Sequence, residues 1–138
     1  MRFGKLSVLV LLLPLVVSCT RVSVTSDSEK YYELASALTK LSSAVEATVR
    51  YDSPPEDITD EQLLKLSTAH DPRILEPFTS YHLDIRVQDR HAVVLVCDAD
   101  KVRGLFEDAG CSAKLDRHIW RESDGACQPA LEIATICN

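Results

Sequence analysis

The sequence is short of the signals that reveal a reaction or an unusual architecture. Glycine and proline occur only four and six times in 138 residues, which excludes collagen-like and low-complexity chains. The motifs Gly-x-Ser-x-Gly and His-Glu-x-x-His and the glycine-rich phosphate loop are absent, so no common enzyme signature is present. The one long apolar run covers residues 6–17, which excludes a polytopic membrane protein. The composition of the whole chain is typical of a globular protein, with 46 % hydrophobic and 26 % charged residues.

Basic residues are in the minority. The chain has 15 Lys and Arg against 21 Asp and Glu, a formal net charge of −6. No acidic residue precedes Asp27, so removing the first segment with Arg2 and Lys5 leaves 13 basic and 21 acidic residues, a net charge of −8. Binding to a phosphate backbone needs clustered Lys and Arg. The sequence therefore predicts no nucleic-acid partner.

The first 19 residues have the organisation of an export signal. Arg2 and Lys5 precede the apolar run of residues 6–17. That run is shorter than the roughly 20 residues that a membrane-spanning helix needs, and Pro14 would weaken a permanent span. A cleaved signal peptide is therefore expected rather than an anchor helix.

The end of this segment, Val16-Val17-Ser18-Cys19, resembles the lipobox of bacterial lipoproteins. The resemblance implies cleavage before Cys19, a diacylglyceryl thioether on its sulfur and acylation of its amine. Residues 1–18 are then a lipoprotein signal peptide and residues 19–27 a lipidated tether that fastens the protein to the cell envelope. Thr20 follows the modified cysteine where Asp favours the inner membrane, so the outer membrane is expected. The alternative is an ordinary secretory peptide with a cysteine near its cleavage point.

Residues 28–138 are predicted to form a single α+β domain, with N-terminal helices packed on a small mixed sheet of three to four strands. Apolar residues at helical spacing predict a long first helix that ends before Pro54-Pro55, and Thr59 with Gln62 has the spacing of a capping box. Strict alternation predicts a half-buried strand over residues 81–87. The continuous apolar run of residues 92–96 predicts a central strand covered on both faces.

The rest of the chain is predicted with a third helix and two strands. Asp98 or Asp100 is expected to cap a helix through residue 109, which Gly110 ends in a left-handed conformation. A strand is predicted around Ile119 and Trp120, and a last strand over residues 131–136, parallel to the central one.

Lipidation of Cys19 would leave an even number of cysteines, which an exported protein prefers. The remaining four are predicted to form two disulfides, Cys97 with Cys137 and Cys111 with Cys127. The predicted topology brings these cysteines to the same ends of the sheet. No Cys-x₂-Cys pair is present, so neither a zinc site nor a thiol-redox centre is predicted, and no metal or cofactor is expected.

Four histidines are candidates for catalytic bases or ligands: His70, His82, His91 and His118. Asp84 is expected on the same strand face as His82, and Asp116 is close to His118 in the chain. Such pairs are common on polar surfaces, so no catalytic residue is assigned. Asp98 and Asp100 resemble part of a calcium loop, but the glycine is one position late and Lys101 and Val102 occupy ligand positions.

The segment with Arg117, Trp120 and Arg121 is the candidate interface, because Trp and Arg are enriched at binding hot spots. The expected function is that of a periplasm-facing lipoprotein, a non-catalytic binding or accessory factor with a pilotin-like or chaperone-like role. Its partners would be the membrane, through the lipid anchor, and an envelope protein. The alternatives are an inhibitor or exclusion lipoprotein directed at an incoming enzyme, toxin or phage, and a small hydrolase using His118 or His82.

Overall fold

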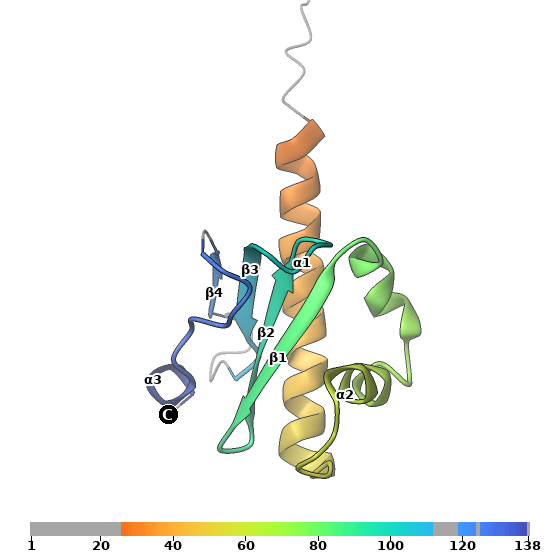
Figure 1. Cartoon of the computed structure of the whole chain (residues 1–138). Coiled ribbons are helices and arrows are strands. Elements are labelled where there is room, and N and C mark those ends of the chain that lie inside the picture. Colours follow the sequence, from red (N-terminus) through yellow and green to blue (C-terminus); the bar gives the residue numbers. More distant parts are fainter. Residues whose placement is uncertain (1–25, 112–118, 124, 138) are drawn as a thin grey trace, which may run out of the picture.

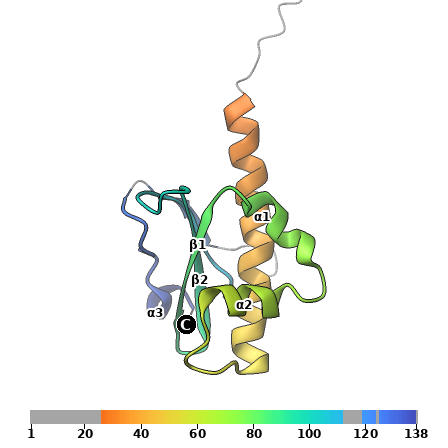
Figure 2. The same ribbon diagram turned by 45° about the vertical axis from the view of Figure 1, so that its right-hand side comes forward.

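The computed structural model of the chain describes residues 26–111, 119–123 and 125–137. Helices α1 (Ser26–Ala47) and α2 (Asp60–Ser67) cover one face of a four-stranded sheet with strand order β1-β2-β3-β4 (Figure 1, Figure 2). We call this the front face, and the opposite one the back face. The predicted α+β fold is confirmed, but all three strand pairs are antiparallel and the sheet is not mixed. None of the helices within the described ranges is long and apolar enough to cross a membrane.

Helix α1 forms because apolar residues recur on one side of it. Leu34, Leu38, Leu41 and Val45 are all buried against the front face, as the three- and four-residue spacing predicts. The helix continues through one wider turn, η1 (Thr48–Asp52), and ends at Ser53, whose φ is 47°. The proline pair that follows cannot continue a helix.

Helix α2 begins with the predicted capping box. The Thr59 hydroxyl accepts a hydrogen bond from the Gln62 amide at 3.3 Å, and the Gln62 side-chain oxygen accepts one from the Thr59 amide at 3.1 Å. A 3₁₀ segment, η2 (Pro72–Phe78), then leads to the sheet. Both elements lie beside α1 on the front face (Figure 2).

Strands β1 (His82–Gln88) and β2 (His91–Cys97) form an antiparallel hairpin. Its two turn residues, Asp89 and Arg90, have φ of 52° and 64°, which matches the two left-handed positions of a type I′ turn. Residues 92–96 have no exposed surface. The central strand is therefore covered on both faces, as its apolar run predicted.

The predicted helix over residues 98–109 is wrong. The chain instead forms strand β3 (Gly104–Ala109), which pairs with β2 and β4 (Ile119–Glu122). Asp98 does not cap a helix, because its Oδ1 accepts the amides of Val102 and Arg103 at 2.8 and 3.2 Å and shapes the turn between strands. Strand β4 confirms the strand expected around residues 119–120.

Gly110 does not adopt the predicted left-handed conformation. Its importance lies in close packing: a Cβ atom there would lie 2.2 Å from the Ser42 carbonyl oxygen on α1. The absence of a side chain therefore allows α1 to approach the end of β3.

The predicted last strand is also wrong, because residues 133–136 form a single helical turn, α3 (Ile133–Ile136). We call residues 125–137 the back strap, since they cross the back face of the sheet (Figure 1, Figure 2). Leu131 and Ile133 are buried there against Val93 and Ala109. Leu131 and Ile133 are thus buried in alternation although this part of the back strap forms no strand.

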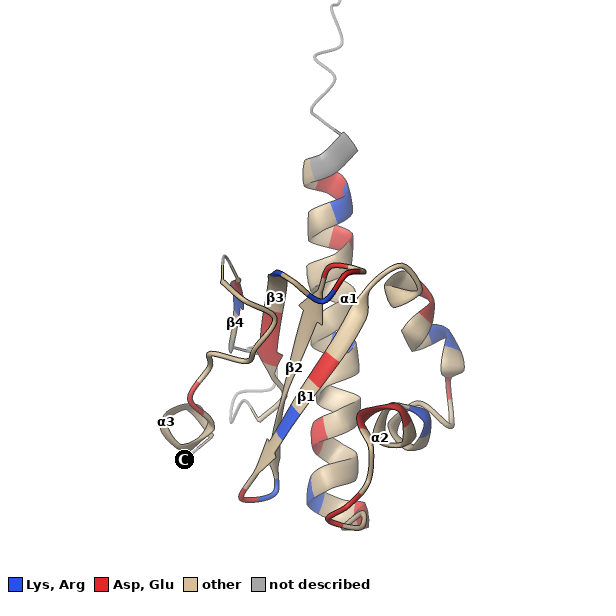
Figure 3. Cartoon of the chain, viewed as in Figure 1, with Lys and Arg blue, Asp and Glu red and all other residues tan. Residues whose placement is uncertain are grey.

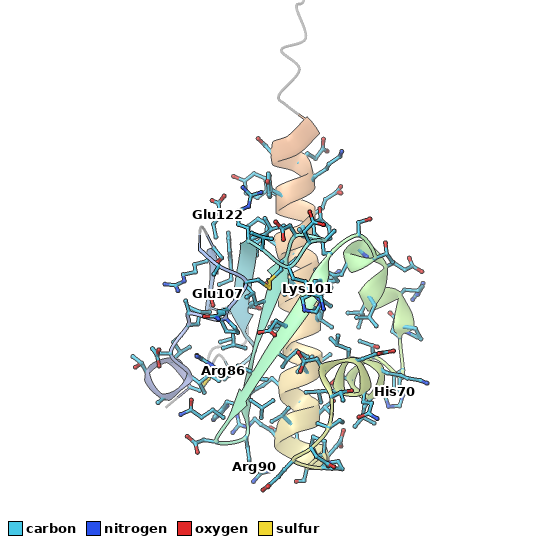
Figure 4. All side chains as sticks on the ribbon, in the orientation of Figure 1. His70, Arg86, Arg90, Lys101, Glu107 and Glu122 are labelled. Carbon is cyan, nitrogen blue, oxygen red and sulfur yellow. A yellow bond between two sulfur atoms is a disulfide. The ribbon has the colours of Figure 1, made fainter. Side chains whose placement is uncertain are left out.

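Two charged side chains bind the backbone of the back strap from either side (Figure 4). Glu107 of β3 accepts hydrogen bonds from the amides of Ala130 and Leu131 at 2.7 and 2.9 Å. Arg86 of β1 donates to the carbonyl oxygens of Pro129 and Leu131. The strap is therefore held by polar contacts in its middle as well as by apolar packing.

All four cysteines of the sheet region are disulfide-bonded as predicted, but the predicted pairing is wrong. The bonds are Cys97–Cys127 and Cys111–Cys137, with Cα atoms 5.6 and 5.3 Å apart. Because β4 runs back toward the Cys97 end of the sheet, the strap begins there and ends beside Cys111. The prediction assumed a final strand running in the opposite direction.

Candidate functional site

Three aromatic rings form a connected cluster at the front face. Phe106 of β3 lies at the centre and is buried, with its ring 5.5 Å from that of Tyr31 on α1 and 6.0 Å from that of Trp120 on β4. Both ring pairs have edge-to-face geometry, which is the arrangement that the aromatic quadrupole favours. The cluster thus joins the first turns of α1 to the edge strand of the sheet.

The outer members of this cluster are open to solvent. Trp120 and Tyr31 are each 46 % exposed, and the neighbouring Tyr32 is 75 % exposed. We call Tyr31, Tyr32 and Trp120 the aromatic surface. A groove of about 240 Å³ runs between these rings, with Glu122 at its border. Tyr and Trp combine a large apolar area with a polar atom, which is why they are enriched at binding interfaces.

A second groove lies on the other side of Tyr32, between α1 and η2. It has a volume of about 920 Å³ and is bordered by charges of both signs, among them Glu33, Lys40, Arg73 and Glu76. Figure 1 shows the start of α1 projecting beyond the sheet, and Figure 3 shows acidic and basic residues along that part of the helix. The exposed start of α1 therefore carries grooves on two sides.

The predicted interface of Arg117, Trp120 and Arg121 is divided by the structure. Trp120 is exposed on the front face, but Arg121 points to the back face, since successive side chains of a strand alternate. Its Nε lies 2.5 Å from the buried Glu107 carboxylate. Arg121 is thus an ion-pair partner of Glu107, and Arg117 lies outside the described residues.

The three candidate histidines that the structure describes, His70, His82 and His91, do not assemble with one another. His70 lies beyond the end of α2, far from Glu107 and the back strap (Figure 4). His82 and Asp84 share the back face of β1, and burial together with the Asp60 carboxylate raises the pKa of Asp84 while His82 opposes the rise. His118 and Asp116 lie outside the described residues, as do Cys19 and the rest of the predicted leader.

His91 has partners that sequence reasoning missed. Its Nδ1 lies 2.6 Å from the Glu46 carboxylate of α1. A ring nitrogen of His91 and the sulfurs of Cys111 and Cys137 lie within 4.8 Å of one another, the single group of metal-ligand type among the described residues. The two sulfurs are bonded to each other, whereas a metal ligand must be a thiolate. No local sequence signal connects Glu46 to His91, which are 45 positions apart.

No protein-family model matches the chain, and neither does any curated protein or solved structure. Its function is therefore inferred from the arrangement of its own residues.

Proposed function

We propose that this protein is a lipid-anchored, non-catalytic binding or accessory factor of the bacterial cell envelope, facing the periplasm from the outer membrane. The aromatic surface is the observation that carries the proposal. Three exposed aromatic side chains border one groove, and such residues dominate the energetics of protein interfaces. A pilotin-like or chaperone-like escort of another envelope protein is the role that this arrangement fits.

The position of the aromatic surface supports a partner at the membrane. The lipobox-like motif ends at Cys19, and α1 begins seven residues later at Ser26. At about 3.5 Å per residue, an extended chain of that length reaches at most about 25 Å. Tyr31 and Tyr32 lie on the first turns of α1, so lipidation of Cys19 would keep the aromatic surface close to the bilayer.

Charge favours a protein partner over the lipid headgroups themselves. Without the leader the chain carries 13 basic and 21 acidic residues, and anionic headgroups attract basic rather than acidic surfaces. Glu122 borders the groove itself. The occupant we propose is therefore an apolar segment of an envelope protein that is held in the same membrane and packs against these aromatic rings.

Lipidation is tested by growing cells with labelled palmitate. The wild-type protein should incorporate the label and fractionate with the outer membrane, whereas Cys19→Ser should do neither. An unlabelled wild-type protein, or a mature N-terminus at another residue, would overturn the anchor and with it the position of the aromatic surface.

The docking surface is tested by site-specific photo-crosslinking in intact cells. A photo-reactive phenylalanine analogue replaces either Tyr32 or Tyr51, which is 77 % exposed in η1, beyond the far end of α1. We expect a discrete protein adduct from position 32, none from position 51, and loss of the adduct when Trp120→Ala is added. Equal adducts from both positions, lipid adducts only, or an adduct that survives Trp120→Ala would refute the assignment.

A further inference from the structure

A buried carboxylate fixes the His91 side chain at the start of β2. Glu46 is only 4 % exposed, and its two oxygens have separate partners. One lies 2.6 Å from His91 Nδ1, and the other accepts the Ala92 amide at 2.8 Å. Because Glu46 is held by the sheet backbone, it positions the imidazole and favours the tautomer with hydrogen on Nδ1. Nε2 is then the nitrogen left for a further partner.

The imidazole of His91 also lies beside a disulfide. A ring nitrogen of His91 and the sulfurs of Cys111 and Cys137 lie within 4.8 Å of one another. Among the described residues no comparable group includes the second disulfide, Cys97–Cys127. Only one of the two disulfides is therefore paired with a carboxylate-bound histidine.

The two cysteines beside His91 differ in exposure. Cys111 is buried, with 7 % of its surface exposed, whereas Cys137 is partly exposed at the end of the single turn of α3. Exchange with a disulfide requires access to one of its sulfurs. On this basis Cys137, the more exposed cysteine, is taken as the point of attack and Cys111 as the leaving group.

We propose that Cys111–Cys137 is a thiol–disulfide exchange site that accepts a cysteine thiol from outside the protein. The incoming thiol gives its proton to His91 Nε2 as its sulfur bonds to Sγ of Cys137. The Cys111–Cys137 bond breaks, its electron pair remains on Cys111, and His91 returns the proton to that sulfur. One thiol and one disulfide thus yield one thiol at Cys111 and one mixed disulfide at Cys137, with no further oxidant or reductant. His91 acts as acid and base, and Glu46 is a positioning residue.

The exchange has a structural consequence for the back strap. Cys111–Cys137 fastens the end of the strap that carries α3, while Cys97–Cys127 fastens the other end. Opening the first bond releases Ile133 of α3 from Val93 and Ala109 but leaves the strap attached at Cys127. The modified protein therefore exposes an apolar part of the back face that the oxidised protein covers.

The test uses folded protein with both disulfides intact and glutathione as the probe. After acid quenching and alkylation of free thiols, trypsin and a protease that cuts after Glu132 separate the four cysteines, so mass spectrometry reports each one. We expect glutathione on Cys137 and alkylation of Cys111 to appear together, at least tenfold faster than any reaction of Cys97 or Cys127. Equal rates at the two disulfides, or glutathione on Cys111, would overturn the proposal.

Variants separate proton transfer from folding. His91→Gln can still donate to Glu46 but cannot pass a proton, and we expect its exchange rate to fall about tenfold or more, since acid–base catalysis contributes about 10²–10⁴. His91→Ala should lose as much and recover part of the rate when imidazole is added. Glu46→Gln, which keeps an acceptor oxygen, should retain far more of the exchange rate than Glu46→Ala. Circular dichroism checks the fold of each variant.

The matched control is His82→Ala, which removes the histidine of β1 that is paired with Cys97 of β2. It should leave the rate at Cys137 unchanged. An unchanged rate in His91→Gln and His91→Ala would show that His91 has no part in the exchange, and a lost rate without recovery in imidazole would show that it transfers no proton; either result overturns its proposed role.

Discussion

Removing the Glu107 carboxylate should be among the most damaging single changes to this fold. The Glu107 side chain has no exposed surface, and its oxygens take hydrogen bonds from Arg121 Nε at 2.5 Å and from the amides of Ala130 and Leu131 at 2.7 and 2.9 Å. Glu107→Ala would leave the buried Leu131 amide without an acceptor, which costs about 1–3 kcal/mol. It would also break three charge-assisted bonds, two of them to the back strap and one to Arg121 of β4.

The expected total follows from how far each partner can regain water. Arg121 is half exposed, and its guanidinium can be rehydrated, so the loss should stay near the range of about 3–5 kcal/mol for breaking a buried pair. Glu107→Gln keeps an oxygen that can accept the two amides but removes the charge. Its cost should be smaller, about 1–2 kcal/mol, because a charge-assisted bond exceeds a neutral one by roughly that amount.

Urea denaturation of the oxidised protein, followed by the fluorescence of its single tryptophan, measures these free energies of unfolding. Keeping both disulfides intact gives every variant the same cross-links in the unfolded state. Glu122→Ala on the exposed edge of the next strand is the control and should change stability by less than about 0.5 kcal/mol. A loss below about 1 kcal/mol for Glu107→Ala, or equal losses for the Gln and Ala variants, would refute the reasoning.

Three further predictions concern packing and pH. Gly110→Ala should cost about 1–3 kcal/mol or more by overpacking, because its Cβ would lie 2.2 Å from the Ser42 carbonyl, whereas Gly125→Ala, with open space around it, should be nearly neutral in the same urea titration. The raised pKa of Asp84 means that its charge opposes folding above that pKa; Asp84→Asn should therefore raise Tm at pH 7 but leave it unchanged at pH 3, and a lower Tm at pH 7 would contradict the burial argument. Hydrogen bonds from the amides of Arg103 and Val102 lower the pKa of Asp98. The ionised carboxylate should therefore stabilise the fold fully above the ordinary aspartate pKa, and this stabilisation should be lost as pH falls through the lowered pKa. NMR of the turn amides should show a titration below the usual aspartate range, and Asp98→Asn should abolish it.

Where local pattern and final environment agree, the sequence was sufficient to predict the fold. The capping box at Thr59 and Gln62 and the apolar run of residues 92–96 each appear in the structure as expected. The two residues of the capping box are close in the chain, and the apolar run lies within a single strand. The order of helices followed by a sheet could therefore be predicted.

The second half misled because its charged residues are buried. Glu107 and Asp108 have no exposed surface, although in the sequence they look like the solvated side of a helix. Their partners lie on the back strap and on α1, where Ser42 donates to Asp108. The buried carboxylates of Glu107 and Asp108 take their hydrogen bonds from residues 14 to 66 positions away, and no local pattern carries that information.

The candidate site was predicted only in part for the same reason. The enrichment of Trp and Arg at binding hot spots predicts one interface that includes Trp120 and Arg121. Trp120 is exposed, but its neighbours on the aromatic surface, Tyr31 and Tyr32, come from the start of α1. Arg121 follows Trp120 in β4, where successive side chains point to opposite faces, so its partner is Glu107.

The two disulfide loops overlap, so proteolytic cleavage within them does not separate the fragments. Cys111 lies inside the loop closed by Cys97–Cys127, and Cys127 lies inside the loop closed by Cys111–Cys137. A single nick in the backbone anywhere between residues 97 and 137 therefore leaves both fragments on one covalent molecule. Cleavage in this half would go unnoticed by gel electrophoresis until the sample is reduced, and the nicked halves would stay in register with each other.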